Sequence, residues 1–172
     1  VTIKGLDSLY KKLEKLGGDG AKAIEDAVKK TVLAAEKSAK ANAPSSSSSQ
    51  ANSTGSVSLR AGIEHEVKST TERIEGRVFS NAPHSVFVEM GTGPVGASNH
   101  MGISPNVNPT YTTRKSWAFP IVIDGEETFR TTSGQPARPF MYPAAVEHKD
   151  THSENIRREL LLAMRRLAKG GG

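Results

Sequence analysis

The chain has no cysteine among its 172 residues, which excludes a disulfide scaffold, a thiolate zinc site, an iron–sulfur cluster and a cysteine nucleophile. Aromatic residues make up only 5% of the sequence, so a core must be built mainly from valine, isoleucine, leucine and alanine. No apolar run approaches the roughly 20 residues needed to cross a bilayer. The first six residues show no basic stretch followed by an apolar one. We therefore expect a soluble protein with no secretory signal and no membrane partner.

Acidic residues are too few to balance the basic ones, and the formal net charge is +5. The surplus lies in the two terminal helical segments, where acids are interleaved with bases, as on an ordinary solvated helix face. The densest basic group comprises Arg157, Arg158, Arg165, Arg166 and Lys169. Such a group suits a helix C-terminus, and it also leaves a basic nucleic-acid-binding module open as an alternative.

Helices are predicted at about 7–43, because apolar residues recur there at helical spacing. The glycine-rich stretch 17–20 separates a short first helix from a long second one, and Pro44 ends the second. Residues 45–56 begin with five consecutive serines and contain too few apolar residues for a packed core. They are predicted to form a flexible loop.

Alternating apolar and polar residues predict a sheet region at 57–132. The clearest signal is Asp124-Gly125, which favours a two-residue type I′ turn between two strands. A long loop is predicted at 91–115, where glycine, proline and asparagine dominate. The strands are expected at 61–68, 73–79, 85–90, 117–123 and 126–132.

The end of the chain predicts a proline-rich extended arm at 134–142 and a C-terminal helix at about 143–169, with Pro143 as its first residue. The order of elements is therefore helices, a mostly antiparallel sheet with a long loop, and a C-terminal helix packed on the sheet. This order predicts an α+β fold in a single domain of residues 1–172.

Three patterns resemble sites of chemistry without completing one. Gly91 to Gly96 match G-x-G-x-x-G, but no helix is expected to follow and no acid lies about 20 residues on, so a dinucleotide site is not expected. His148 and His152 are four residues apart, yet a zinc site needs three or four ligands, and solvated histidines are the simpler interpretation. His84 and Ser85 are neighbours that point to opposite faces of a strand. We predict no catalytic residue, no cofactor and no metal.

Several segments, in order, resemble a family of small tailed-bacteriophage proteins called tail-completion, neck or minor capsid/tail components. The two most specific are Val86-Phe87-Val88-Glu89-Met90-Gly91-Thr92-Gly93 and Gln135-Pro136-Ala137-Arg138-Pro139-Phe140-Met141-Tyr142-Pro143-Ala144. The others are the opening Ile3–Leu9, the alanine-rich helix ending in Ala43-Pro44, Ser53–Gly55, and Leu59-Arg60-Ala61-Gly62-Ile63. A serine-rich insert and the long loop distinguish this chain from the family pattern.

The resemblance implies a structural virion protein, not an enzyme, synthesised in the bacterial host cytoplasm. It would form a homo-oligomeric ring in the neck, with six copies favoured over twelve, joining the capsid connector or head-closure proteins to the tail tube or its terminator. Genomic DNA would pass through the channel of the ring without sequence-specific binding. The motif residues that become interface candidates are Glu89, Gly91, Thr92, Gly93, Pro136, Arg138, Pro139, Phe140 and Pro143.

Two of these candidates have local interpretations that remain open. Phe140 is either an interface anchor or a core residue, and Arg138 is either an anchor or one partner of a local salt bridge. Two alternative functions stay open beside the joining ring. One is a nucleic-acid-binding module, and the other is an enzyme whose only candidate groups are the histidines and Glu89.

Overall fold

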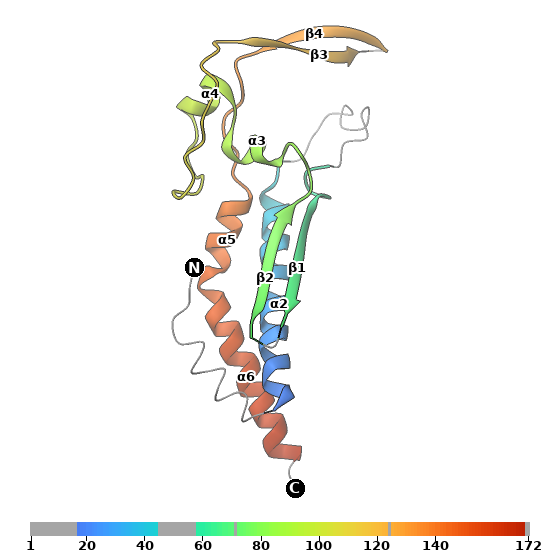
Figure 1. Ribbon diagram of the computed structural model, residues 1–172, viewed down its shortest axis with the longest axis vertical. Helices are drawn as coiled ribbons and strands as arrows, with labels where there is room; N and C mark the ends of the chain where they lie inside the picture. Colours follow the sequence, from blue (N-terminus) through green and yellow to red (C-terminus); the bar gives the residue numbers. More distant parts are fainter. Residues whose placement is uncertain (1–16, 45–57, 71, 124, 171–172) are drawn as a thin grey trace. The chain divides into compact units, whose positions relative to one another are not determined.

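The computed structural model describes residues 17–44, 58–70, 72–123 and 125–170 (Figure 1). Helices and two antiparallel hairpins alternate along the chain, which confirms the predicted α+β class. The predicted helix before Gly17 and the serine-rich loop 45–56 lie outside the described residues. The elements are α2 (Gly18–Asn42), β1 (Ile63–Ser69), β2 (Ile74–Ser80), α3 (Ser85–Met90), α4 (Gly93–Ser98), β3 (Trp117–Ile123), β4 (Glu126–Thr132), α5 (Met141–Lys149) and α6 (Thr151–Gly170).

The chain folds into two compact units. The first unit contains most of α2, most of the β1–β2 hairpin and α6, and the second contains the end of α2, α3, α4, the β3–β4 hairpin and the start of α5. Four elements, α2, β1, β2 and α5, run from one unit into the other.

The core of the first unit is a stripe of α2. Ile24, Val28 and Val32 recur at intervals of four residues and are buried. Side chains from the hairpin and from α6 pack against this stripe, and these are Val67, Ile74, Val78 and Leu160. Helix α6 therefore packs on the apolar face of α2, the same helix that the strands cover.

Gly76 allows β2 to lie directly on α2. A Cβ atom at this position would come within 2.5 Å of Val32 Cγ1 and 2.7 Å of Val28 Cγ1. Any side chain would therefore push the strand away from the helix. The glycine weakens the strand slightly in isolation, and the close packing with the valines offsets that loss.

Helix α2 ends in the second unit, where Arg60 satisfies its terminal carbonyl groups. The guanidinium donates from Nε at 3.0 Å and from Nη2 at 2.8 Å to the carbonyl oxygen of Ala43. Leu59 and Ile63, on either side of Arg60, are buried. The Leu-Arg-x-x-Ile segment is thus a helix cap held between two core residues.

The β3–β4 hairpin confirms the strongest local prediction. Its register pairs Trp117 with Thr132 and Ile123 with Glu126, which leaves a two-residue connection. Gly125 has φ +86°, the left-handed conformation that glycine tolerates best. The predicted turn type also depends on Asp124, which lies outside the described residues.

The segment 85–90 is a helix, α3, and the strand predicted there is wrong. Six residues are too few for their periodicity to separate a strand from a helix. Because this third strand does not form, the expected single sheet region is instead two two-stranded sheets. The predicted loop 91–115 also contains a helix, α4.

The C-terminal helix begins two residues before Pro143 and continues, after a break at Asp150, as α6. Among the described residues, no helix is long and apolar enough to span a bilayer.

Candidate functional site

The two most specific motifs of the sequence meet at one place in the second unit. Glu89, near the end of α3, directs its carboxylate at the start of α5. Oε2 accepts hydrogen bonds from the backbone N–H groups of Phe140 at 2.8 Å and Met141 at 3.0 Å. Oε1 accepts a third bond from the N–H of Tyr142 at 2.9 Å. One carboxylate therefore accepts three backbone N–H groups at the start of α5, where the first N–H groups have no partner within the helix.

Backbone hydrogen bonds join the same two segments on either side of Glu89. Thr92 N–H donates to the carbonyl oxygen of Gln135 at 2.9 Å, and Gln135 N–H donates back to that of Thr92 at 3.2 Å. Arg138 N–H donates to the carbonyl oxygen of Val88 at 2.8 Å. The Gln135 amide adds a bond from Nε2 to the carbonyl oxygen of Phe87 at 2.9 Å. We call this set of contacts between residues 87–96 and 133–142 the motif junction.

The glycines of the first motif allow this close approach. Gly91 has φ +76°, and a Cβ atom there would come within 2.7 Å of Ala137 N and 2.8 Å of Gln135 O. Gly93 has φ +60°, and its Cβ would come within 2.7 Å of Ser133 O. A side chain at either position is therefore excluded for two reasons: the backbone conformation favours glycine, and neighbouring backbone atoms occupy the space.

The G-x-G-x-x-G pattern is explained by this packing. In a dinucleotide site, the glycines keep space open for a pyrophosphate at the start of a long helix. Here the atoms next to Gly91 and Gly93 belong to the chain itself, at residues 133–137, and α4 has only six residues. The glycine pattern is a device for backbone packing.

Residues 7–91 match the family model described as "HK97-gp10_like: Bacteriophage HK97-gp10, putative tail-component". This segment of the chain is therefore similar to the HK97-gp10-like family. No curated protein and no solved structure matches it. The family assigns the chain, in coarse terms, to the structural tail or head–tail components of phage virions.

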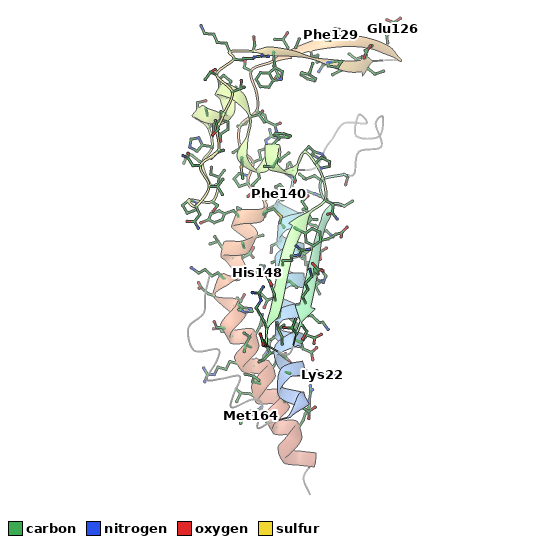
Figure 2. All side chains as sticks on the ribbon, viewed as in Figure 1. Lys22, Glu126, Phe129, Phe140, His148 and Met164 are labelled. Atoms are coloured by element: carbon green, nitrogen blue, oxygen red, sulfur yellow. The ribbon has the colours of Figure 1, made fainter. Side chains whose placement is uncertain are left out.

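The remaining candidate residues lie along the second segment of the motif junction, except Pro143, which follows it in α5. Pro136, Pro139 and Pro143 are half-buried. Phe140 is fully buried, which matches the core interpretation of this residue (Figure 2). Arg138 is exposed, and within the described residues its guanidinium forms no ion pair, so it stays an interface candidate.

Glu89, the acid of the enzyme hypothesis, has both carboxylate oxygens engaged by backbone N–H groups. His84 is the N-cap residue of α3, and Ser85 donates its backbone N–H to Ala82. These three residues serve local folding and do not form a nucleophile with a base.

The two histidines near the end of the chain lie on different helices, His148 on α5 and His152 on α6. Within the described residues, no group of three or more metal-ligating side chains comes together. His152 is half-buried rather than solvated, with Nδ1 at 3.4 Å from Thr31 Oγ1, and burial lowers the pKa of its imidazole.

Sequence reasoning missed three residues that complete the motif junction. Gly134 has φ +102°, and a Cβ atom there would lie 1.9 Å from Thr92 O. Tyr111 donates its hydroxyl to Met90 O at 2.7 Å, and burial raises the pKa of this phenol. The Trp117 ring lies against Gly93. Only Gly134 carried a local signal, since it precedes the proline-rich motif.

Proposed function

We propose that this protein forms a closed homo-oligomeric ring in the neck of a long-tailed phage virion, with six copies favoured over twelve. The ring joins the connector of the capsid to the tail tube and leaves a channel for the genomic DNA. The observation that carries the proposal is the match of residues 7–91 to the HK97-gp10-like family. Closed rings arise from head-to-tail contacts between two different surfaces of one subunit.

The arrangement of the second unit supports a structural role. The motif junction uses the Glu89 carboxylate and the glycines to hold backbone segments together. Apolar side chains are at the same time exposed on the β3–β4 hairpin, among them Val122 and Phe129. A rigid junction beside an exposed apolar hairpin fits a subunit that is completed by neighbouring chains.

The test is the mass of the purified protein by light scattering, first alone and then mixed with the connector and tail-tube proteins of its phage. A six-fold ring, or a monomer that enters a six- or twelve-fold complex on mixing, supports the proposal. A monomer that remains unchanged with both partners contradicts it.

A second candidate function, nucleic-acid binding, is favoured by one observation. Four arginines are exposed along α6, at positions 157, 158, 165 and 166. If they bind phosphates, the affinity for a DNA fragment falls steeply as salt rises. Binding that is weak at every salt concentration leaves the joining ring as the better account.

A further inference from the structure

The β3–β4 hairpin has one face that is exposed along its whole length. In the observed register, Ala118 pairs with Thr131, Pro120 with Phe129, and Val122 with Glu127. Paired residues project from the same side of a two-stranded sheet. All six are exposed, with Phe129 at 70% and Val122 at 56%. We call this side of the hairpin the open face.

The open face is apolar and acidic. It carries Glu127 and no base, while Glu126, which pairs with Ile123 next to the turn, projects from the opposite side. The only basic residue of the hairpin, Arg130, pairs with Phe119 and so projects from the opposite side. A two-stranded hairpin in water is marginally stable alone, so an apolar face of this kind calls for a covering surface.

A strand added to the edge of β3 does not fit as the covering surface. Pro120 stands in the middle of that strand and has no N–H to donate, so it interrupts the edge. A helix that lies across the open face needs no backbone hydrogen bonds from the hairpin.

Helix α6 presents a face with the opposite charge and similar apolar content. Two rows at i, i+4 spacing run along it, Arg157–Leu161–Arg165 and Arg158–Leu162–Arg166. All six residues are exposed, with Leu161 at 45%. We call these rows the arginine–leucine face. Eight residues of helix span about 12 Å, which is comparable to the three residue pairs of the open face.

Among the described residues of α6, the buried side chains lie on the side opposite the arginine–leucine face. The opposite side of α6 carries Ile156, Leu160 and Ala163, which are buried or half-buried, and Glu159, whose Oε1 accepts a hydrogen bond from Lys30 Nζ at 2.5 Å. Within the part of the chain that the structure describes, Arg157 and Arg165 form no ion pair. Two leucines bounded by four arginines therefore stay exposed to solvent.

We propose that the open face of the hairpin in one copy docks on the arginine–leucine face of α6 in a neighbouring copy. Phe129 and Val122 cover Leu161 and Leu162, and Glu127 lies beside the arginines. The two surfaces differ, so the contact is head-to-tail and each subunit offers one of each, as a closed ring requires. This inference rests on the proposed function and identifies the contact that would build the ring.

The experiment uses two charge reversals in the full chain. The hairpin variant is E126K/E127K, and the helix variant is R157E/R165E, which spares Arg158 and its hydrogen bond to Asn155. Each variant alone should lose the oligomer and give the 18.4 kDa monomer by light scattering. The control is E64K/E72K, which changes the net charge as much as the hairpin variant does, at two exposed acids away from both surfaces. It should assemble like the wild type.

Mixing the two defective variants gives the decisive measurement. The hairpin variant keeps an intact arginine–leucine face and the helix variant keeps an intact open face, so the native contact forms between them. The second contact joins the lysines of the hairpin variant to the glutamates of the helix variant, so both charges are exchanged there. The mixture should therefore rebuild the oligomer with the two variants alternating, although neither variant assembles alone. All four reversals in one chain should restore the oligomer, because both charges are then exchanged. Circular dichroism and the midpoint of denaturation show that each variant is folded.

Three results would overturn the inference. An oligomer that survives both variants shows that the ring is built through other surfaces, and the proposed function stands. A wild-type chain that stays monomeric at every concentration shows that the two faces do not bind each other, and the mixture with connector and tail-tube proteins then tests the function separately. If R157E/R165E loses DNA binding but keeps the oligomer, the arginines serve nucleic acid instead.

Discussion

At the scale of single residues, Glu89 shows how a motif acid can be wholly structural. Its position in the first motif gives no hint of its partners, because they lie about 50 residues further on. The three N–H groups that it binds are at the start of α5, where a negative charge is also favoured by the helix dipole.

Glu89→Ala should destabilise the protein by about 1–3 kcal/mol, because three backbone donors lose their acceptor at once. Glu89→Gln should cost less, since one amide oxygen can still accept. The free energy of unfolding in urea measures both changes. The control is Glu72→Ala at an exposed position, which should change stability by less than about 0.5 kcal/mol. An Ala variant as stable as the wild type would contradict the role assigned to Glu89.

Gly76→Ala should destabilise the first unit by about 1–3 kcal/mol, because the new methyl group overlaps Val32 and Val28. Adding Val32→Ala in the same chain makes room, so the double variant should lose less than the sum of the two single changes. Gly18→Ala is the matched control. Its Cβ meets nothing within 4 Å, and the substitution should be neutral or slightly stabilising. Additive losses in the double variant would show that the overlap is not the cause.

At the scale of elements, the sequence predicted those whose signals are local. Helix α2 has a long apolar stripe, and the β3–β4 hairpin has strand patterns on both sides of Asp-Gly; both formed. Helix α2 nevertheless begins at Gly18, inside the glycine-rich stretch predicted to separate two helices. The segment 85–90 carries three apolar residues with strand preference, yet it is helical, and its Glu89 carboxylate binds the distant start of α5. Partners so distant in sequence leave no periodic trace, so neither α3 nor the motif junction could be derived from local patterns.

The contact between α6 and α2 should depend on pH through Glu159. The hydrogen bond from the Lys30 ammonium holds the pKa of this carboxyl below its ordinary value of 4.5, against the opposing effect of burial. A folded pKa below the unfolded one means that the unfolded chain binds the proton more readily. The resulting stability is present above about pH 4.5 and is lost as the pH falls through the lower folded value.

Glu159→Gln isolates this contribution. At pH 7 the variant should be less stable than the wild type by about 1 kcal/mol, because Lys30 is half-exposed and the ion pair is screened. The difference in the free energy of unfolding should shrink as the pH falls below 4.5. A difference that stays constant from pH 7 to pH 3 would exclude the Lys30–Glu159 pair as its source.

At the scale of the whole molecule, the continuity of four elements through both compact units has an energetic consequence. When α2 melts, both units lose part of their structure, because its stripe forms the core of one and its end carries the Arg60 cap of the other. The predicted single domain therefore implies that the two units unfold together in one cooperative transition.

Denaturation should therefore follow one transition in two different signals. Trp117, the only tryptophan, reports on the second unit, and far-ultraviolet circular dichroism reports mainly on α2 and α6. Gly76→Ala, in the first unit, should move the midpoints of both signals by the same amount. Two separate midpoints, with only the dichroism shifted by the substitution, would show that the units unfold independently.

The motif junction also fixes where the chain can change its length. Ala137 N–H donates to Asn99 O at 2.9 Å, so the chain leaves the junction after Asn99 and has returned to it by residue 133. Between these points the chain contacts the junction again, through the Tyr111 hydroxyl and the Trp117 ring. The hairpin beyond Trp117 can therefore change in length or sequence with less effect on the junction than the segment before it. The family match ends at Gly91, before the hairpin begins. We therefore expect the hairpin to differ more than the matched segment does among phage proteins that share this segment. Differences that suit different neighbouring proteins should accumulate in the hairpin.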